Sequence, residues 1–155
     1  MTEPLWRPSP TQIAAANMTK FRAQVARDWS VDLQDSAALW QWSVTEIEHF
    51  WESLWRFCGV IGDGPGKTIL KDRHLMPGAQ FFPEARLNFA ENMLRHAADP
   101  AWAGRDAIVF WGEDKVKRRL SYGDLHDRVS RLVQHLRALG LQPGDRVAGF
   151  VPNAP

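Results

Sequence analysis

The sequence has little of what defines several large classes of protein. It contains a single cysteine, Cys58, among 155 residues, which excludes a framework of internal disulfide bonds. Its apolar runs are far shorter than the roughly 20 residues of a membrane-spanning helix. Early prolines and Glu3 stand where a signal peptide has a basic and then an apolar stretch. We therefore expect a cytoplasmic protein without a membrane partner. Because Cys58 falls on the apolar face of a predicted helix, we expect its thiol to be buried and unreactive.

An excess of charge of one sign is also absent. The chain has 19 basic and 18 acidic residues, a formal net charge of +1, with the two signs interspersed, so no nucleic-acid partner is expected. The five histidines show no metal-ligand spacing with carboxylate or cysteine support; they are His49, His74, His96, His126 and His135. The sequence has no nucleophile elbow, Cys-x-x-Cys pair or paired-acid motif. We therefore assign no catalytic, cofactor-binding or metal-binding residue.

Tryptophan, in contrast, is abundant and clustered. Six of the eight tryptophans lie in the first 55 residues, which marks a separate helical unit. A capping box at Ser9-Pro10-Thr11-Gln12, followed by apolar residues at helical spacing, predicts a helix over 10–29. A second capping box, Ser43-Val44-Thr45-Glu46, predicts a helix that runs until Gly59. A tryptophan stripe at helical spacing is more typical of core packing than of a platform for sugars or peptides.

The next segment carries a glycine-rich stretch, Gly62-Asp63-Gly64-Pro65-Gly66-Lys67-Thr68. Glycines followed by lysine and a hydroxyl are typical of loops that cradle phosphate. The first glycine comes one residue late for that pattern, Pro65 removes a donor, and no long amphipathic helix follows, so a solvated linker is the simpler interpretation. After a proline-punctuated extended stretch, Asn88 and Glu91 predict the capped start of a short helix.

Beyond Trp102 the pattern becomes α/β. Residues 106–112 predict a strand, and residues 115–120 predict a second, more exposed strand that forms an edge hairpin with the first. A helix capped at Ser121 should extend to Leu139, and a final buried strand should cover 145–151, which favours a parallel or mixed sheet. The basic residues Lys115, Lys117, Arg118 and Arg119 indicate a charged edge strand that discourages aggregation more than an anion site. Since a buried strand needs neighbours, we expect the front part of a larger protein.

These motifs together resemble the N-terminal region of acyl-adenylate-forming acid–thiol ligases. Within that superfamily they are similar to the acetyl-CoA-synthetase-like branch, and in particular to acetoacetate–CoA ligases. The resemblance covers nearly the whole chain and rests on the order and spacing of the helix at 50–55, Met76-Pro77-Gly78, Phe82-Pro83, the Ala85–Asn92 string, Leu120-Ser121-Tyr122, Gly144-Asp145-Arg146-Val147 and Pro152-Asn153. Glu84 stands where the family usually has glycine.

The resemblance implies a two-step reaction. The carboxylate of acetoacetate, or of a similar short acid, attacks the α-phosphate of ATP to give an acyl-adenylate and pyrophosphate, and the thiol of CoA then displaces AMP. ATP, Mg²⁺ and CoA are thus implied for the full-length family. The family's phosphate loop, acid pocket, CoA contacts and catalytic lysine lie downstream of the position matching Pro155, so none is assigned to a residue here. The expected partner is the remainder of the ligase chain, and we expect this chain alone to be inactive.

The expected fold is α/β: a tryptophan-rich helical cap followed by the first strands and helix of an incomplete adenylate-forming large domain. We predict a helical cap over 1–61, an extended linker with a short helix over 62–104, and the truncated start of the AMP-binding domain over 105–155. Two alternatives to the ligase interpretation stay open at this point. One is a stand-alone helical interaction module that uses its tryptophans, and the other is a small nucleotide-binding protein built around Gly66-Lys67-Thr68.

Overall fold

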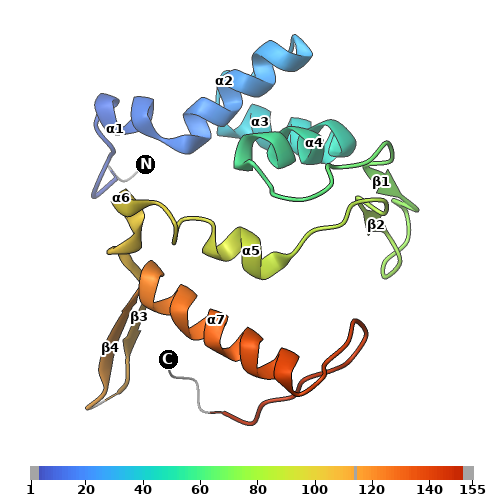
Figure 1. The fold of residues 1–155 in the computed structure, drawn as a ribbon. Helices are drawn as coiled ribbons and strands as arrows, with labels where there is room; N and C mark the ends of the chain where they lie inside the picture. The colour runs from blue at the N-terminus through green and yellow to red at the C-terminus, as the bar shows by residue number, and fades with distance from the viewer. Residues whose placement is uncertain (1–3, 114, 152–155) are drawn as a thin grey trace. The chain divides into compact units, whose positions relative to one another are not determined.

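The structure, a computed structural model, describes residues 4–113 and 115–151. The chain divides into two compact units, Met1–Leu87 and Asn88–Pro155. The first unit contains α1 (Pro10–Ala15), α2 (Asn17–Trp29), α3 (Ser36–Thr45), α4 (Ile47–Cys58), β1 (Leu70–Lys71) and β2 (Gln80–Phe81). The second contains α5 (Phe89–Leu94), α6 (Pro100–Ala103), β3 (Asp106–Trp111), β4 (Lys117–Ser121) and α7 (Tyr122–Ala138). Figure 1 shows the order of these elements along the ribbon.

The prediction of one helix over 10–29 is wrong, because the chain breaks at Ala16. This residue is extended (φ −64°, ψ 138°) and separates α1 from α2. The hydroxyl of Thr19 donates a hydrogen bond of 2.7 Å to the carbonyl of Ile13. That bond satisfies one of the carbonyl groups that a helix end leaves without a partner. The capping box at Ser9 and Gln12 is confirmed.

The prediction of a capping box at 43–46 is also wrong. Residues 43–45 form the last turn of α3, where the Ser43 hydroxyl donates to the carbonyl of Trp40 at 2.7 Å. The start of α3, which the sequence pattern did not indicate, is capped by the Asp35 carboxylate, which accepts the N–H of Ala38 at 2.8 Å. The following helix, α4, is confirmed and ends at Gly59, whose φ of 57° is left-handed.

The core of the first unit lies among α2, α3 and α4. Five apolar side chains are buried there: Phe21, Val25, Leu33, Leu39 and Trp42. The ring of Phe21 packs edge-on against Phe50 and Phe57 of α4, with ring centroids 5.9 and 5.1 Å apart. The expectation of core packing holds for Trp29 and Trp42, whereas the side chain of Trp40 is 63% exposed. Cys58 is exposed, so its predicted burial is wrong: it lies in the last turn of α4.

A short antiparallel hairpin packs against the other side of α4. β1 and β2 pair Leu70 with Phe81 and Lys71 with Gln80. Trp51 packs edge-on against Phe81, and Trp55 packs at a tilt against Phe82, with ring centroids 5.1 and 4.9 Å apart. Two residues per strand are too few to stabilise a hairpin in water. These aromatic contacts therefore anchor the hairpin to the helix.

The second unit confirms the predicted hairpin and helix but not the final strand. β3 and β4 pair in antiparallel register, with Val109 opposite Arg119 and Trp111 opposite Lys117. Ser121 and Asp124 form the capping box of α7, and Asn88 caps α5. Residues 145–151 form no strand, since no strand in the described part of the chain lies beside them, and Phe150 is fully exposed. Both sheets among the described residues are antiparallel pairs, not parallel or mixed.

The core contacts predict a contrast between two substitutions on α3. Leu39 is 5% exposed and Val44 is 45% exposed. Leu39→Ala should lower the free energy of unfolding by about 2–5 kcal/mol, because it leaves a cavity in the core. Val44→Ala should change it by less than about 0.5 kcal/mol. Urea unfolding followed by tryptophan fluorescence measures both, and equal losses would contradict this placement of the core.

Candidate functional site

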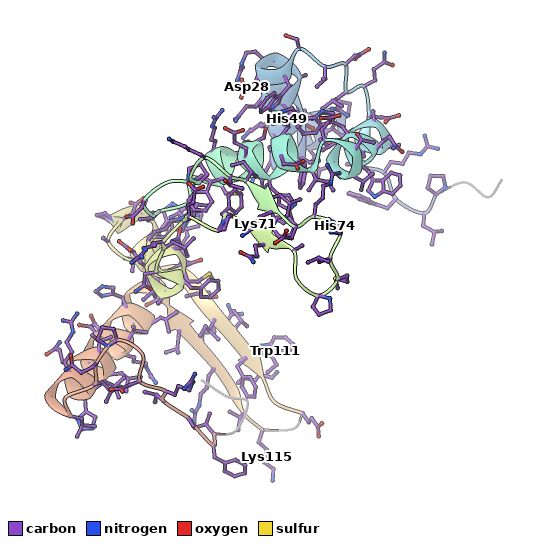
Figure 2. The ribbon with its side chains drawn as sticks, turned by 90° about the vertical axis from the view of Figure 1, so that its right-hand side faces the viewer. Asp28, His49, Lys71, His74, Trp111 and Lys115 are labelled. Carbon is purple, nitrogen blue, oxygen red and sulfur yellow. The ribbon has the colours of Figure 1, made fainter. Side chains whose placement is uncertain are left out.

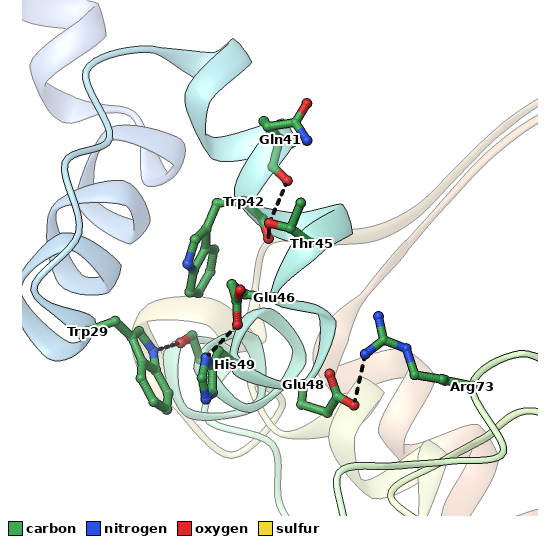
Figure 3. A network of polar contacts seen from close by, with 9 residues as sticks. Trp29, Gln41, Trp42, Thr45, Glu46, Glu48, His49 and Arg73 are labelled. Atoms are coloured by element: carbon green, nitrogen blue, oxygen red, sulfur yellow. Dashed lines mark hydrogen bonds and ion pairs between the residues drawn. The ribbon is translucent and has the colours of Figure 1, made fainter.

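Polar side chains gather where the end of α2 meets α4 (Figure 3). The indole Nε1 of Trp29 donates to the hydroxyl of Ser53 at 2.7 Å. The ring of His49 stacks on that indole, with centroids 3.9 Å apart, and His49 Nδ1 lies 3.3 Å from a carboxylate oxygen of Glu46. Ser53 is only 2% exposed. A buried hydroxyl that accepts from an indole has no opening toward a substrate, so this group of contacts positions α2 on α4.

The predicted solvated linker at 62–68 has a defined internal contact instead. Glu84, from the segment after β2, reaches back to it. Its carboxylate accepts the backbone N–H of Lys67 and the hydroxyl of Thr68, each at 2.9 Å. Gly66 has a φ of 79°, and a Cβ added there would lie 2.8 Å from the Cβ of Glu84. Glycine is therefore required both for the left-handed turn and for the close approach.

The hydrogen bonds of this loop favour the charged form of Glu84. The N–H of Lys67 lowers the pKa of that carboxyl most, followed by the hydroxyl of Thr68, whereas partial desolvation opposes the shift. The nucleotide-binding interpretation of the loop loses support, because Thr68 is followed by strand β1 and not by a helix. A phosphate loop needs the helix N-terminus for its remaining donors.

In the second unit, the basic side chains of the hairpin are engaged with their own neighbours. The Lys117 ammonium lies 4.5 Å from the ring centroid of Trp111, and Arg119 forms an ion pair with Asp106. Trp111 is 67% exposed and is labelled on the hairpin in Figure 2. These contacts agree with a solvated strand face, and the role in discouraging aggregation stays a prediction.

A compact aromatic cluster surrounds Trp102 of α6. His96 stacks on its ring at 4.7 Å, the Arg105 guanidinium lies 4.3 Å from its centroid, and Tyr122 packs edge-on at 6.3 Å. Two groups already cover the indole, so it offers no platform for a ligand. The cluster joins α6 to the start of α7.

The described residues give no candidate metal centre. Among residues 4–113 and 115–151, no group of three or more His, Cys, Asp or Glu side chains could hold a metal ion. No helix in those ranges is long and apolar enough to cross a lipid bilayer. A hollow of about 260 Å³ on the first unit is lined by Asn17, Met18, Phe21, Leu54, Phe57 and Cys58, a largely apolar set without a carboxylate or histidine for acid–base work. The side chains that the structure brings together thus position helices and strands against one another.

Comparison with known proteins gives the family context of this arrangement. Residues 36–93 match the family described as acetyl-coenzyme A synthetase N-terminus, and residues 94–155 match the family described as AMP-binding enzyme. Acetoacetyl-coenzyme A synthetase from Rhizobium meliloti (strain 1021) is 43% identical over 152 residues, which are 98% of this chain and 22% of that protein. The chain is homologous to the N-terminal part of acetoacetyl-CoA synthetases.

Other homologues extend the match in sequence and in structure. Malonamoyl-CoA synthetase from Penicillium aethiopicum is 34% identical over 97% of this chain and 21% of its own length. The structure of acetoacetyl-CoA synthetase from Streptomyces lividans matches with a TM-score of 0.81 and 38% identity, over 99% of this chain and 24% of that one. The chain thus spans about a fifth of the length of the curated relatives. The mixed helix and strand fold is that of the N-terminal portion of the synthetase.

Neither the buried hydroxyl of Ser53 nor the contact of Glu84 emerged from the sequence. Ser53 interrupts the apolar stripe of α4, and that interruption is a usable signal for a buried hydrogen bond, although its partner lies 24 residues away. Glu84 carries no comparable signal, because a lone carboxylate in a proline-rich stretch has many possible surroundings.

The Trp29–Ser53 hydrogen bond predicts a measurable coupling. Ser53→Ala leaves the indole N–H without its acceptor, which should cost about 1–3 kcal/mol. In a Trp29→Phe background the same change should cost less, because no donor is then left unpaired. The free energies of unfolding of the two single variants and the double variant measure the coupling. Strictly additive losses would show that the hydrogen bond contributes nothing.

Glu84 predicts a pH dependence of stability. Its folded-state pKa is lowered from the ordinary value of 4.5, so its contribution is present above that value and is lost as the pH falls through the lowered pKa. The difference in unfolding free energy between the wild type and Glu84→Gln should therefore be largest near neutral pH and shrink in acid. Urea unfolding across this range tests it. Asp124→Asn gives an independent comparison in the other unit, because the Ser121 hydroxyl also lowers the pKa of that carboxyl and the same direction of pH dependence is expected. A difference between the wild type and Glu84→Gln that is independent of pH would contradict the role of the Glu84 charge.

Proposed function

We propose that this chain forms the N-terminal part of an AMP-forming acid–thiol ligase that activates acetoacetate or a similar short acid. The observation that carries the proposal is the identity of 43% and 38% to two acetoacetyl-CoA synthetases, over 98% and 99% of the chain. In the proposed reaction, a carboxylate oxygen of the acid attacks the α-phosphorus of ATP and pyrophosphate leaves. The thiol of CoA then attacks the acyl carbon, and AMP leaves with the electron pair of the broken bond.

The contribution of this chain to that reaction is a scaffold. Its described contacts fix helices and hairpins against one another, as with Trp55 on Phe82 and Trp102 on Tyr122. Phosphoryl chemistry depends on positioned cations and amide donors, and we derive no step of it through the residues described here. ATP, Mg²⁺ and CoA belong to the proposal for the whole ligase. We also propose that the chain divides into a cap over 1–61, a linker over 62–104 and the start of the AMP-binding domain over 105–155.

Exposed apolar residues on α7 and after it support this role. Leu132 on α7 is 56% exposed, and Leu139 and Val147, which follow the helix, are each 64% exposed. Clusters of exposed apolar residues of this kind mark surfaces that contact other protein. The alternative of a stand-alone helical interaction module is not favoured, because the match to the synthetases runs through both units and is not confined to the tryptophan-rich helices.

A graft tests the scaffold role. The matching segment of the Streptomyces lividans synthetase is replaced by residues 1–155 of this chain, and acetoacetate-dependent formation of AMP is measured. We expect the graft to retain activity, whereas the synthetase without the segment and the 155-residue chain alone should form no AMP above a buffer control. A graft that unfolds at the same temperature as the parent but is inactive would contradict the proposal, as would activity of the chain alone.

The acid substrate needs a separate measurement, since a graft takes its acid pocket from the host. The nucleotides that follow the codon for Pro155 in the source genome should encode, in one of three frames, a Ser/Thr/Gly-rich loop closed by lysine. The protein expressed from that frame should exchange pyrophosphate into ATP faster with acetoacetate than with acetate. Absence of such a loop from every frame would remove the basis for the activity.

A further inference from the structure

The Gly66–Thr68 loop presents hydrogen-bond donors that converge on one carboxylate, that of Glu84. The N–H of Lys67 and the hydroxyl of Thr68 each contact a different oxygen of the Glu84 carboxylate. The backbone N–H of Thr68 also favours the charged carboxylate. Backbone N–H groups in turns that contain a left-handed residue form concavities, called nests, that bind anions. Gly66, with its φ of 79°, supplies the left-handed residue.

The anion in this nest belongs to the chain itself. Glu84 lies 16 residues beyond Thr68 and comes from the segment after β2. A carboxylate and a phosphate present the same type of acceptor, oxygen atoms that share negative charge, and accept the same donors. The donors that hold the Glu84 carboxylate are therefore of the kind that also suit a free oxyanion.

We propose that the Gly66–Thr68 loop is an oxyanion-binding site that Glu84 occupies in cis, so that a free oxyanion binds there once the Glu84 carboxylate is removed. The inference is independent of the proposed ligase activity. The site differs from a nucleotide-binding phosphate loop because a strand, β1, and not a helix follows it. Without the N–H groups of a helix N-terminus, its few donors suffice only for one small anion, such as inorganic phosphate or sulfate.

The tethered carboxylate explains why the wild type should bind little phosphate. An intramolecular group acts at an effective concentration in the millimolar range or higher, set by its tether. Here the tether is folded, because Phe82 donates its N–H to the carbonyl of Ile69 at 2.8 Å and the N–H of Asp63 donates to the carbonyl of Arg86 at 3.0 Å. A free anion must displace Glu84 from this position. We expect its apparent affinity to be at least about tenfold weaker than in a variant without the carboxylate.

The test is a titration of the full ¹⁵N-labelled chain with sodium phosphate at neutral pH, read from the backbone amide signals. In Glu84→Ala, the amides of Lys67 and Thr68 should shift saturably at millimolar phosphate, and sulfate should give the same shifts. The wild type should need at least about tenfold more phosphate to reach half of the maximal shift. Sodium chloride at equal ionic strength separates binding from screening.

Two matched variants define the result. Glu84→Gln places an uncharged acceptor in the nest and should respond less than Glu84→Ala. Adding Thr68→Val to Glu84→Ala removes the hydroxyl donor and should weaken the response. Unchanged amide signals outside 62–68 and 82–86 show that each variant is folded, and Glu84→Ser replaces Glu84→Ala should the latter fail that criterion. Equal responses in the wild type and the carboxylate-free variant, or no saturable shift in that variant, would overturn the proposal.

Discussion

Helix α4 is the element on which the first unit depends, because it packs on both sides. Phe50 and Phe57 meet Phe21 of α2, while Trp51 and Trp55, four residues apart, meet Phe81 and Phe82 beyond β1. A helix repeats every 3.6 residues, so these two sets lie on different faces of one rod. Aromatic side chains bring large apolar areas into contact, so these pairs hold the unit together on both sides of α4. The two-residue strands and the helical core are thereby joined through one helix.

The sequence predicted best those features whose causes lie within a few residues. The caps at Asn88 and Ser121, the end of α4 at Gly59 and the hairpin of β3 and β4 each arise from neighbouring side chains and turn residues. The errors arose where contacts that the pattern does not show decided the outcome, and some of these contacts are local, such as the Asp35 cap of α3. A single helix over 10–29 looked continuous because alanine at position 16 favours a helix, whereas the Thr19 side chain takes the Ile13 carbonyl and the helix ends. The final apolar segment shows the same limit, since hydropathy alone indicates a strand but hydrogen-bonded neighbours make one.

The candidate site was less predictable than the fold for the same physical reason. Ser53 finds its donor 24 residues away, and Glu84 finds the loop 16 and 17 residues back. Neither pairing leaves a periodic pattern, because a single polar side chain in a loop or an apolar stripe fits many surroundings. The family resemblance could be seen in the sequence alone, because it rests on the order of many weak motifs and does not depend on any one contact.

The Gly66–Thr68 loop shows how similar residues acquire different chemistry from the element that comes after them. Glycine, lysine and threonine in this order bind nucleotide phosphates when a helix begins at once, because its first N–H groups and its dipole add to the loop's own donors. Here the chain enters β1, and the loop keeps only the few donors that one carboxylate can satisfy. A carboxylate on the same folded chain loses less freedom on binding than a free ion does. The identity of residue 84 therefore decides whether this turn is closed by its own chain or open to an anion from solution.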